Sequence, residues 1–147
     1  MSQSAIVAIV LAVLAVVERA ALGVVCLQQG QPVLETYLLP TALGAVIIWG
    51  LVRGSRLAWR WARILGAILG LFALLCGSYE MGSTEMTMRA GLLLSEGALL
   101  LGMSAALSMS GARKHFRMVC PRCGSRRVGA ANLAFSEAYC RRCETIW

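Results

Sequence analysis

Four cysteines near the C-terminal end of the chain are spaced as the ligands of a single metal ion. Cys120 and Cys123 form one C-x-x-C pair, Cys140 and Cys143 form a second, and sixteen residues separate the two pairs. This spacing is typical of a zinc site with four thiolate ligands. Each pair can turn two sulfurs toward one point, and two pairs complete the tetrahedron of a closed structural zinc site. The sequence therefore predicts one Zn²⁺ per chain, with iron in the same four thiolates or a dithiol redox pair as alternatives.

The segment around this motif, about residues 116–147, resembles the zinc-ribbon family. The resemblance rests on CPRCG at 120–124 and YCRRC at 139–143. A glycine commonly follows each cysteine pair in this family because the chain must turn sharply there, and this chain has Gly124 after the first pair but Glu144 after the second. The resemblance implies a small antiparallel sheet with strand residues at three places: 127–128, 133–135 and 145–147.

The residue types present argue against catalysis. Four cysteines close the coordination shell of the metal, so the predicted site is structural rather than catalytic. The chain contains no aspartate and only one histidine, His115, which excludes a Ser-His-Asp set and a haem held by two histidines of this chain. We therefore predict that the protein is not an enzyme. The remaining cysteines, Cys26 and Cys76, lie in apolar segments, where buried free thiols are the default and a disulfide is the alternative.

The composition indicates a membrane protein. Hydrophobic residues make up 59% of the 147 residues, only 14% are charged, and the mean hydropathy is +0.72. Soluble domains carry about 25% charged residues. Four apolar segments are long enough to cross a bilayer as helices: 5–27, 36–53, 58–78 and 89–110. The predicted fold class is membrane all-α, a four-helix transmembrane bundle over residues 1–110 followed by a small β zinc ribbon over residues 111–147.

Small residues recur along two of these segments. Gly66 and Gly70 are four residues apart in the third segment. Ridges of this kind let helix backbones approach closely in lipid. The fourth segment carries a longer series at three- and four-residue steps, and packing within the bundle or against a partner subunit would use it: Gly91, Ser95, Ala98, Gly102 and Ala106.

Charges between the apolar segments predict the orientation of the chain. The link over residues 53–63 holds four arginines and no acid, whereas the links over 28–36 and 78–89 hold glutamates. The positive-inside rule then places the arginine-rich link and both termini in the cytoplasm. A cytoplasmic position also keeps the thiolates of a metal site reduced. We therefore predict an integral membrane protein of the bacterial inner-membrane type with both ends inside.

Three ionisable residues lie within the apolar segments: Glu18, Arg19 and Glu96. Charges at this depth are costly and normally face the interior of a bundle in pairs. Arg19 lies eight residues in from Leu27 and Glu96 seven residues in from Arg89, which puts both about 11–12 Å deep. We therefore predict an Arg19–Glu96 ion pair that joins the first and fourth helices. A proton or ion path and a contact to another subunit are the alternatives.

The region after residue 110 is strongly basic, and its basic residues form a candidate binding surface: Arg113, Lys114, Arg117, Arg122, Arg126, Arg127, Arg141 and Arg142. A basic cluster next to a membrane is attracted to anionic lipid of the cytoplasmic leaflet. Exposed arginines on a zinc ribbon also suit a protein partner or nucleic acid, as the family resemblance implies.

These features together predict a non-enzymatic accessory subunit of a larger membrane complex, with the zinc ribbon as its cytoplasmic docking module and other membrane subunits as partners. Two alternatives remain open at this stage. One is a membrane-anchored adaptor that binds nucleic acid or a soluble regulator through the basic ribbon. The other is a small transporter or proton-coupled subunit that uses Glu18, Arg19 and Glu96.

Overall fold

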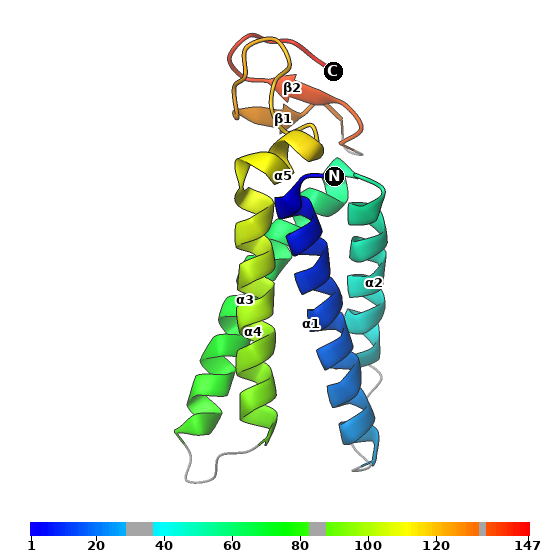
Figure 1. Cartoon of the computed structure of the whole chain (residues 1–147), viewed down its shortest axis with the longest axis vertical. Coiled ribbons are helices and arrows are strands. Elements are labelled where there is room, and N and C mark those ends of the chain that lie inside the picture. Colours follow the sequence, from blue (N-terminus) through cyan, green and yellow to red (C-terminus); the bar gives the residue numbers. More distant parts are fainter. Residues whose placement is uncertain (29–36, 83–87, 133–134) are drawn as a thin grey trace.

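The computed structural model describes residues 1–28, 37–82, 88–132 and 135–147. Four longer helices lie side by side and a small sheet covers one end of them (Figure 1). The elements, in chain order, are α1 (Gln3–Gln28), α2 (Leu39–Val52), α3 (Arg56–Met81), α4 (Met88–Ser108), α5 (Ser110–His115), β1 (Val128–Ala130) and β2 (Ala138–Cys140). By length and composition, α1, α3 and α4 are able to cross a membrane, whereas α2 has 14 residues.

Local sequence explains where these helices begin and end. Pro40 lies in the first turn of α2, where its missing N–H costs no hydrogen bond. The predicted second segment begins at Thr36, which lies outside the described residues. Gly54, at a φ of +73°, turns the chain between α2 and α3. The Ser55 side chain then caps α3 by accepting a hydrogen bond from the N–H of Ala58 at 3.4 Å.

Small residues let α3 and α4 approach closely. A Cβ added to Gly97 of α4 would lie 2.9 Å from the carbonyl oxygen of Gly70 on α3. The predicted packing of the α4 small-residue ridge within the bundle is wrong for two of its members, and packing against a partner subunit stays a prediction. Gly91 has open space around it and Ala98 is exposed, so neither meets α3. The reason is that α4 packs between two helices, and Gly102 of the same ridge faces α1 instead.

The helices place small side chains inward and large apolar side chains outward. Over residues 3–17 of α1 the buried residues include Ala5, Ala8, Ala12 and Ala15, and the exposed ones include Val7, Val10, Leu14 and Val17. The outer surface of α3 likewise exposes Ile68, Leu71, Phe72 and Leu75. A helix in water shows the opposite arrangement, because large apolar side chains are the ones buried there. The pattern is the one expected of helices whose outer surface faces lipid.

The C-terminal module, which we define as residues 116–147, contacts the helices at the end where α2 meets α3 (Figure 1). Arg56, the first residue of α3, donates from Nη1 to the carbonyl oxygens of Ser136 and Trp147, each at 3.1 Å. Beneath the module, the indole of Trp59 is buried and donates to the carbonyl oxygen of Leu107 on α4 at 3.0 Å. The module therefore contacts the helices through directed hydrogen bonds.

A continuous apolar core joins the module to the helices. It contains Trp59 and Leu107 from the helices together with Phe116, Met118 and Phe135 from the module. Phe116 is fully buried, and the ring of His115 lies edge-on against it with 5.0 Å between centroids. Burial of such aromatic side chains contributes roughly 1.5–3 kcal/mol each. The two parts of the chain therefore share one core.

The sheet of the module pairs β1 with β2 antiparallel, with Val128 opposite Cys140. The predicted strand over 133–135 is wrong at Phe135, because this residue has a φ of +55°, outside the strand region, and is buried. Residues 133 and 134 lie outside the described residues. The Oδ1 of Asn132 accepts from the N–H of Ser136 at 3.0 Å, and its carbonyl oxygen accepts from the N–H of Phe135 at 3.1 Å, so local bonds take the place of strand pairing at Phe135. At the other edge, a single bridge joins Tyr139 to Ile146, within the predicted last strand.

Candidate metal centre

Each C-x-x-C pair lies on a tight turn with the same hydrogen bonds. In the first turn, the N–H of Cys120 donates to the oxygen of Ser125 at 3.0 Å, and the N–H of Gly124 donates to the oxygen of Cys120 at 3.0 Å. The second turn repeats both bonds: Cys140 N–H to the oxygen of Thr145 at 3.0 Å and Glu144 N–H to the oxygen of Cys140 at 2.9 Å. Two sequence-distant turns therefore present their cysteine pairs in the same way.

The residue after each cysteine pair takes the left-handed conformation. Gly124 has a φ of +66° and Glu144 a φ of +58°. The departure of Glu144 from the family pattern therefore leaves the turn geometry unchanged. A residue with a side chain in this region costs roughly 1–2 kcal/mol relative to the right-handed region, whereas glycine does not. The second turn carries a strain that the first one lacks.

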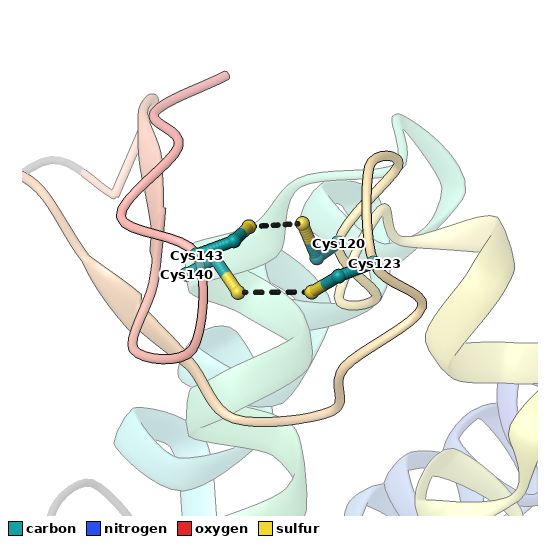
Figure 2. Close-up of side chains that lie close together, drawn as sticks. All are labelled: Cys120, Cys123, Cys140 and Cys143. Atoms are coloured by element: carbon teal, nitrogen blue, oxygen red, sulfur yellow. Dashed lines mark hydrogen bonds between the residues drawn. The ribbon is translucent and has the colours of Figure 1, made fainter.

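The four sulfurs meet in one cluster between the two turns (Figure 2). The Sγ atoms of Cys120 and Cys143 are 3.5 Å apart, those of Cys123 and Cys140 are 3.6 Å apart, and all four lie within 4.8 Å of one another. A tetrahedral ion with metal–sulfur bonds of about 2.3 Å would hold its sulfurs about 3.8 Å apart. The donor set and its spacing therefore fit one metal ion, and the predicted ligand cysteines are brought together.

The thiols of this cluster influence one another strongly. The hydroxyl of Thr145, 3.3 Å from the Cys143 sulfur, and the N–H of Thr145 lower the pKa of Cys143 to about 6. The backbone of Ser125 lowers the pKa of Cys123, but burial and the neighbouring thiols raise it to about 12 overall. Four thiolates so close together repel one another. A divalent cation at their centre removes that repulsion and allows all four to ionise.

Replacing Glu144 with glycine is expected to stabilise the module by about 1 kcal/mol, because the strained φ is relieved and the gain exceeds the added flexibility of the unfolded chain. The measurement is the concentration of a competing chelator that strips the metal from the full-length protein. Glu144→Gln, which keeps a side chain but loses the charge, should leave this chelator concentration unchanged. A Gly124→Ala variant as stable as the wild type would contradict this explanation.

Arg19 and Glu96 form the ion pair that their equal depth predicts. The Nε and Nη2 atoms of Arg19 both lie 2.6 Å from Oε1 of Glu96. Glu96 is 2% exposed, and its second oxygen, Oε2, has no hydrogen-bond partner among the described residues. The adjacent Glu18 accepts a hydrogen bond from the hydroxyl of Ser95 at 3.3 Å. The three ionisable residues therefore join α1 to α4 at one level.

The predicted basic residues lie on the module and on α5, and most of them are exposed: Lys114, Arg117, Arg122, Arg126, Arg127, Arg141 and Arg142. Arg113 is half-buried and donates to the carbonyl oxygen of Ser108 at 2.9 Å. From the sequence, Arg56 is assigned to topology and Arg60 to topology and to the membrane interface. In the structure Arg56 holds the module, and the Arg60 guanidinium lies 5.6 Å from the centroid of the Phe135 ring. The cluster of four arginines in the 53–63 link was the sequence feature that could have indicated these contacts.

The two cysteines outside the cluster are free thiols. Cys26 is buried at the end of α1, and its thiol donates to the hydroxyl of Tyr37 at 3.3 Å. Cys76 is half-buried on α3. Neither of these cysteines belongs to the four-cysteine cluster.

The fold and the site together define a mainly helical protein with three long apolar helices and a C-terminal four-cysteine module consistent with a zinc ribbon. No protein-family model matches the chain, and no curated protein or solved structure matches it significantly.

Proposed function

We propose that this protein is a non-enzymatic integral membrane subunit that presents a zinc ribbon to a partner complex in the cytoplasm. In this proposal α1 to α4 are four transmembrane helices and the four cysteines hold one Zn²⁺ ion as a structural staple. The proposal is carried by one observation: the four-cysteine module is fixed by hydrogen bonds and a shared core to the arginine-rich end of the helices. A module held in this way keeps a constant orientation, which suits docking.

The outer side of the ribbon supplies the docking surface of the proposed function. Arg122, Arg142 and Ile146 are exposed residues of the ribbon, and Ile146 is a large apolar residue three positions after the ligand Cys143 in the sequence. Exposed arginines and apolar side chains are typical of protein interfaces. The closed four-thiolate shell leaves no position for a substrate, which agrees with a non-enzymatic role.

The orientation of the chain has a direct test. A cysteine introduced at Ser83 is expected to react with an impermeant thiol reagent in intact cells, whereas one at Ser110 is expected to react only after the membrane is opened. The reason is the excess of arginine in the 53–63 link and of glutamate in the other two. The background should be the Cys26→Ser, Cys76→Ser double variant. The opposite labelling pattern would place the ribbon outside the cytoplasm.

Co-purification from native membrane tests the docking role. The wild-type protein is expected to carry the same partner chain at a fixed stoichiometry through two purification steps in detergent. Cys140→Ser, which removes a metal ligand, should lose that partner, and Cys76→Ser, which changes a thiol outside the cluster, should keep it. A partner retained by Cys140→Ser would show that the ribbon does not dock it.

A second candidate, a proton-coupled or ion-coupled transport subunit, is favoured by the unpaired Oε2 of Glu96. Glu96 and Arg19 both line a cavity of about 100 Å³ between the four helices. Intramembrane acids of this kind mark ion paths in transporters. Flux that is lost in Glu96→Gln but retained after deletion of the ribbon would favour this candidate. The adaptor alternative predicts salt-sensitive binding of RNA or DNA by the full-length protein instead.

A further inference from the structure

A cleft lies between the ribbon and the ends of the helices, with a volume of about 650 Å³. Five arginines line it, from three separate parts of the chain: Arg60 and Arg63 of α3, Arg113 of α5, and Arg126 and Arg141 of the ribbon. No acidic residue lines the cleft, and none of these arginines forms a salt bridge within the part of the chain that the structure describes. Guanidinium groups stay charged at any physiological pH, so the cleft concentrates uncompensated positive charge.

Neutral groups hold these arginines in place. The Arg63 guanidinium lies 4.8 Å from the centroid of the Trp59 ring, and that of Arg60 lies 5.6 Å from the Phe135 ring. Among the described residues, Arg113 donates from its Nε to the carbonyl oxygen of Ser108 at 2.9 Å. A guanidinium has five N–H donors, so most donors remain available to a ligand. The cleft therefore holds several guanidinium groups in position, with N–H donors available to a ligand.

The ribbon side of the cleft depends on the fold of the sheet. The N–H of Arg141, directly after β2, donates to the carbonyl oxygen of Arg127 at 2.9 Å. The Arg141 side chain then lies across β1 over Gly129, where an added Cβ would be 3.8 Å from its Nε. Arg126 and Arg141 consequently face the cleft, while their sequence neighbours Arg127 and Arg142 do not line it.

We propose that this cleft binds a multiply charged phosphate group, and that the phosphate is the headgroup of an anionic phospholipid. Arginine forks match phosphate oxygens in geometry and charge. The cleft opens where the helices end, which is the level of lipid headgroups, and basic pockets of this kind bind them. The assignment of this phosphate to a lipid rests on the membrane placement in the proposed function. The binding of a phosphate group by the cleft does not depend on that placement.

The test compares two double variants of the full-length, zinc-loaded protein with the same change in charge. In phosphatidylcholine vesicles doped with phosphatidic acid, R126Q/R141Q is expected to bind phosphatidic acid about a hundredfold more weakly than the wild type, because two charge-assisted contacts are lost. R127Q/R142Q should stay within about threefold. Bound lipid is counted by mass spectrometry after detergent extraction, and equal metal content verifies that each variant is folded.

A second arm separates the two sources of phosphate. Pyrophosphate is titrated into protein held in pure phosphatidylcholine nanodiscs. Phosphatidic acid binding with the expected variant pattern, together with no binding of pyrophosphate, supports the lipid headgroup. Pyrophosphate binding with the same pattern supports the phosphate site but replaces the lipid by a soluble ligand. Equal losses in both double variants, or no binding in either arm, would overturn the site. Neither arm involves a partner protein, so failure here is distinct from failure of docking.

Discussion

Replacing Cys140 with serine is expected to unfold the ribbon and leave the helices intact. The module is small, and its sheet consists of two three-residue strands, so it buries little core of its own. A structural zinc ion supplies on the order of 10 kcal/mol or more to modules of this kind. Loss of one ligand should therefore expose the backbone after residue 117 to hydrogen exchange, while α1, α3 and α4 keep their protection.

Two further variants test this expectation, one as a control and one with a smaller expected effect. Cys76→Ser alters a thiol on α3 that is outside the cluster and should leave both metal content and exchange unchanged. Arg56→Gln removes the hydrogen bonds to Ser136 and Trp147 and should loosen the module without releasing the metal. Full protection of the ribbon in metal-free Cys140→Ser would show that the shared core, not the metal, maintains its fold.

Replacing Arg19 with leucine is expected to destabilise the helices by about 3–5 kcal/mol, because the change leaves the Glu96 carboxylate buried without a partner. Glu96 is buried, and its other oxygen has no hydrogen-bond partner among the described residues, so the Arg19 guanidinium is the group that stabilises the carboxylate. The double variant Arg19→Leu with Glu96→Leu should be more stable than the single one, since apolar side chains replace both charges. The measurement is the free energy of unfolding in lipid or detergent.

The pair between Arg89 and Glu80 provides the matched control. Its atoms are 3.4 Å apart and the Arg89 side chain is 60% exposed. Arg89→Leu should therefore cost less than about 1 kcal/mol. A double variant that is no more stable than Arg19→Leu at neutral pH would contradict a paired role for these charges.

The sequence was sufficient for features that depend on spacing. Each C-x-x-C pair carries its own turn geometry, and the spacing of the two pairs is typical of one shared metal site, so the meeting of the four sulfurs was predictable. The Arg19–Glu96 pair followed from counting residues along two helices of known rise. Apolar length and composition likewise predicted α1, α3 and α4. For each of these features, the regular geometry of a helix or turn relates the number of residues between two positions to the distance between them.

Features that depend on the packing of distant elements were not predictable. The choice of Gly97 over Ala98 for contact with α3 depends on the rotation of α4, which its two neighbouring helices set together. Phe135 is a strand-forming residue by type, but it is buried in the same apolar core as Trp59 and has a positive φ, which ends any strand there. The contacts of Arg56 with Ser136 and Trp147 join residues 80 and 91 positions apart, which no local pattern indicates.

The central claim is that a metal-stapled ribbon is fixed to the end of a membrane-embedded bundle. Native mass spectrometry of the protein extracted from its own membrane tests this claim most directly. The account predicts that the folded chain carries one zinc ion, that the ion is lost in Cys140→Ser, and that the chain is recovered only from the membrane fraction. A chain that is folded in the membrane without any metal, or that carries iron, would contradict the account.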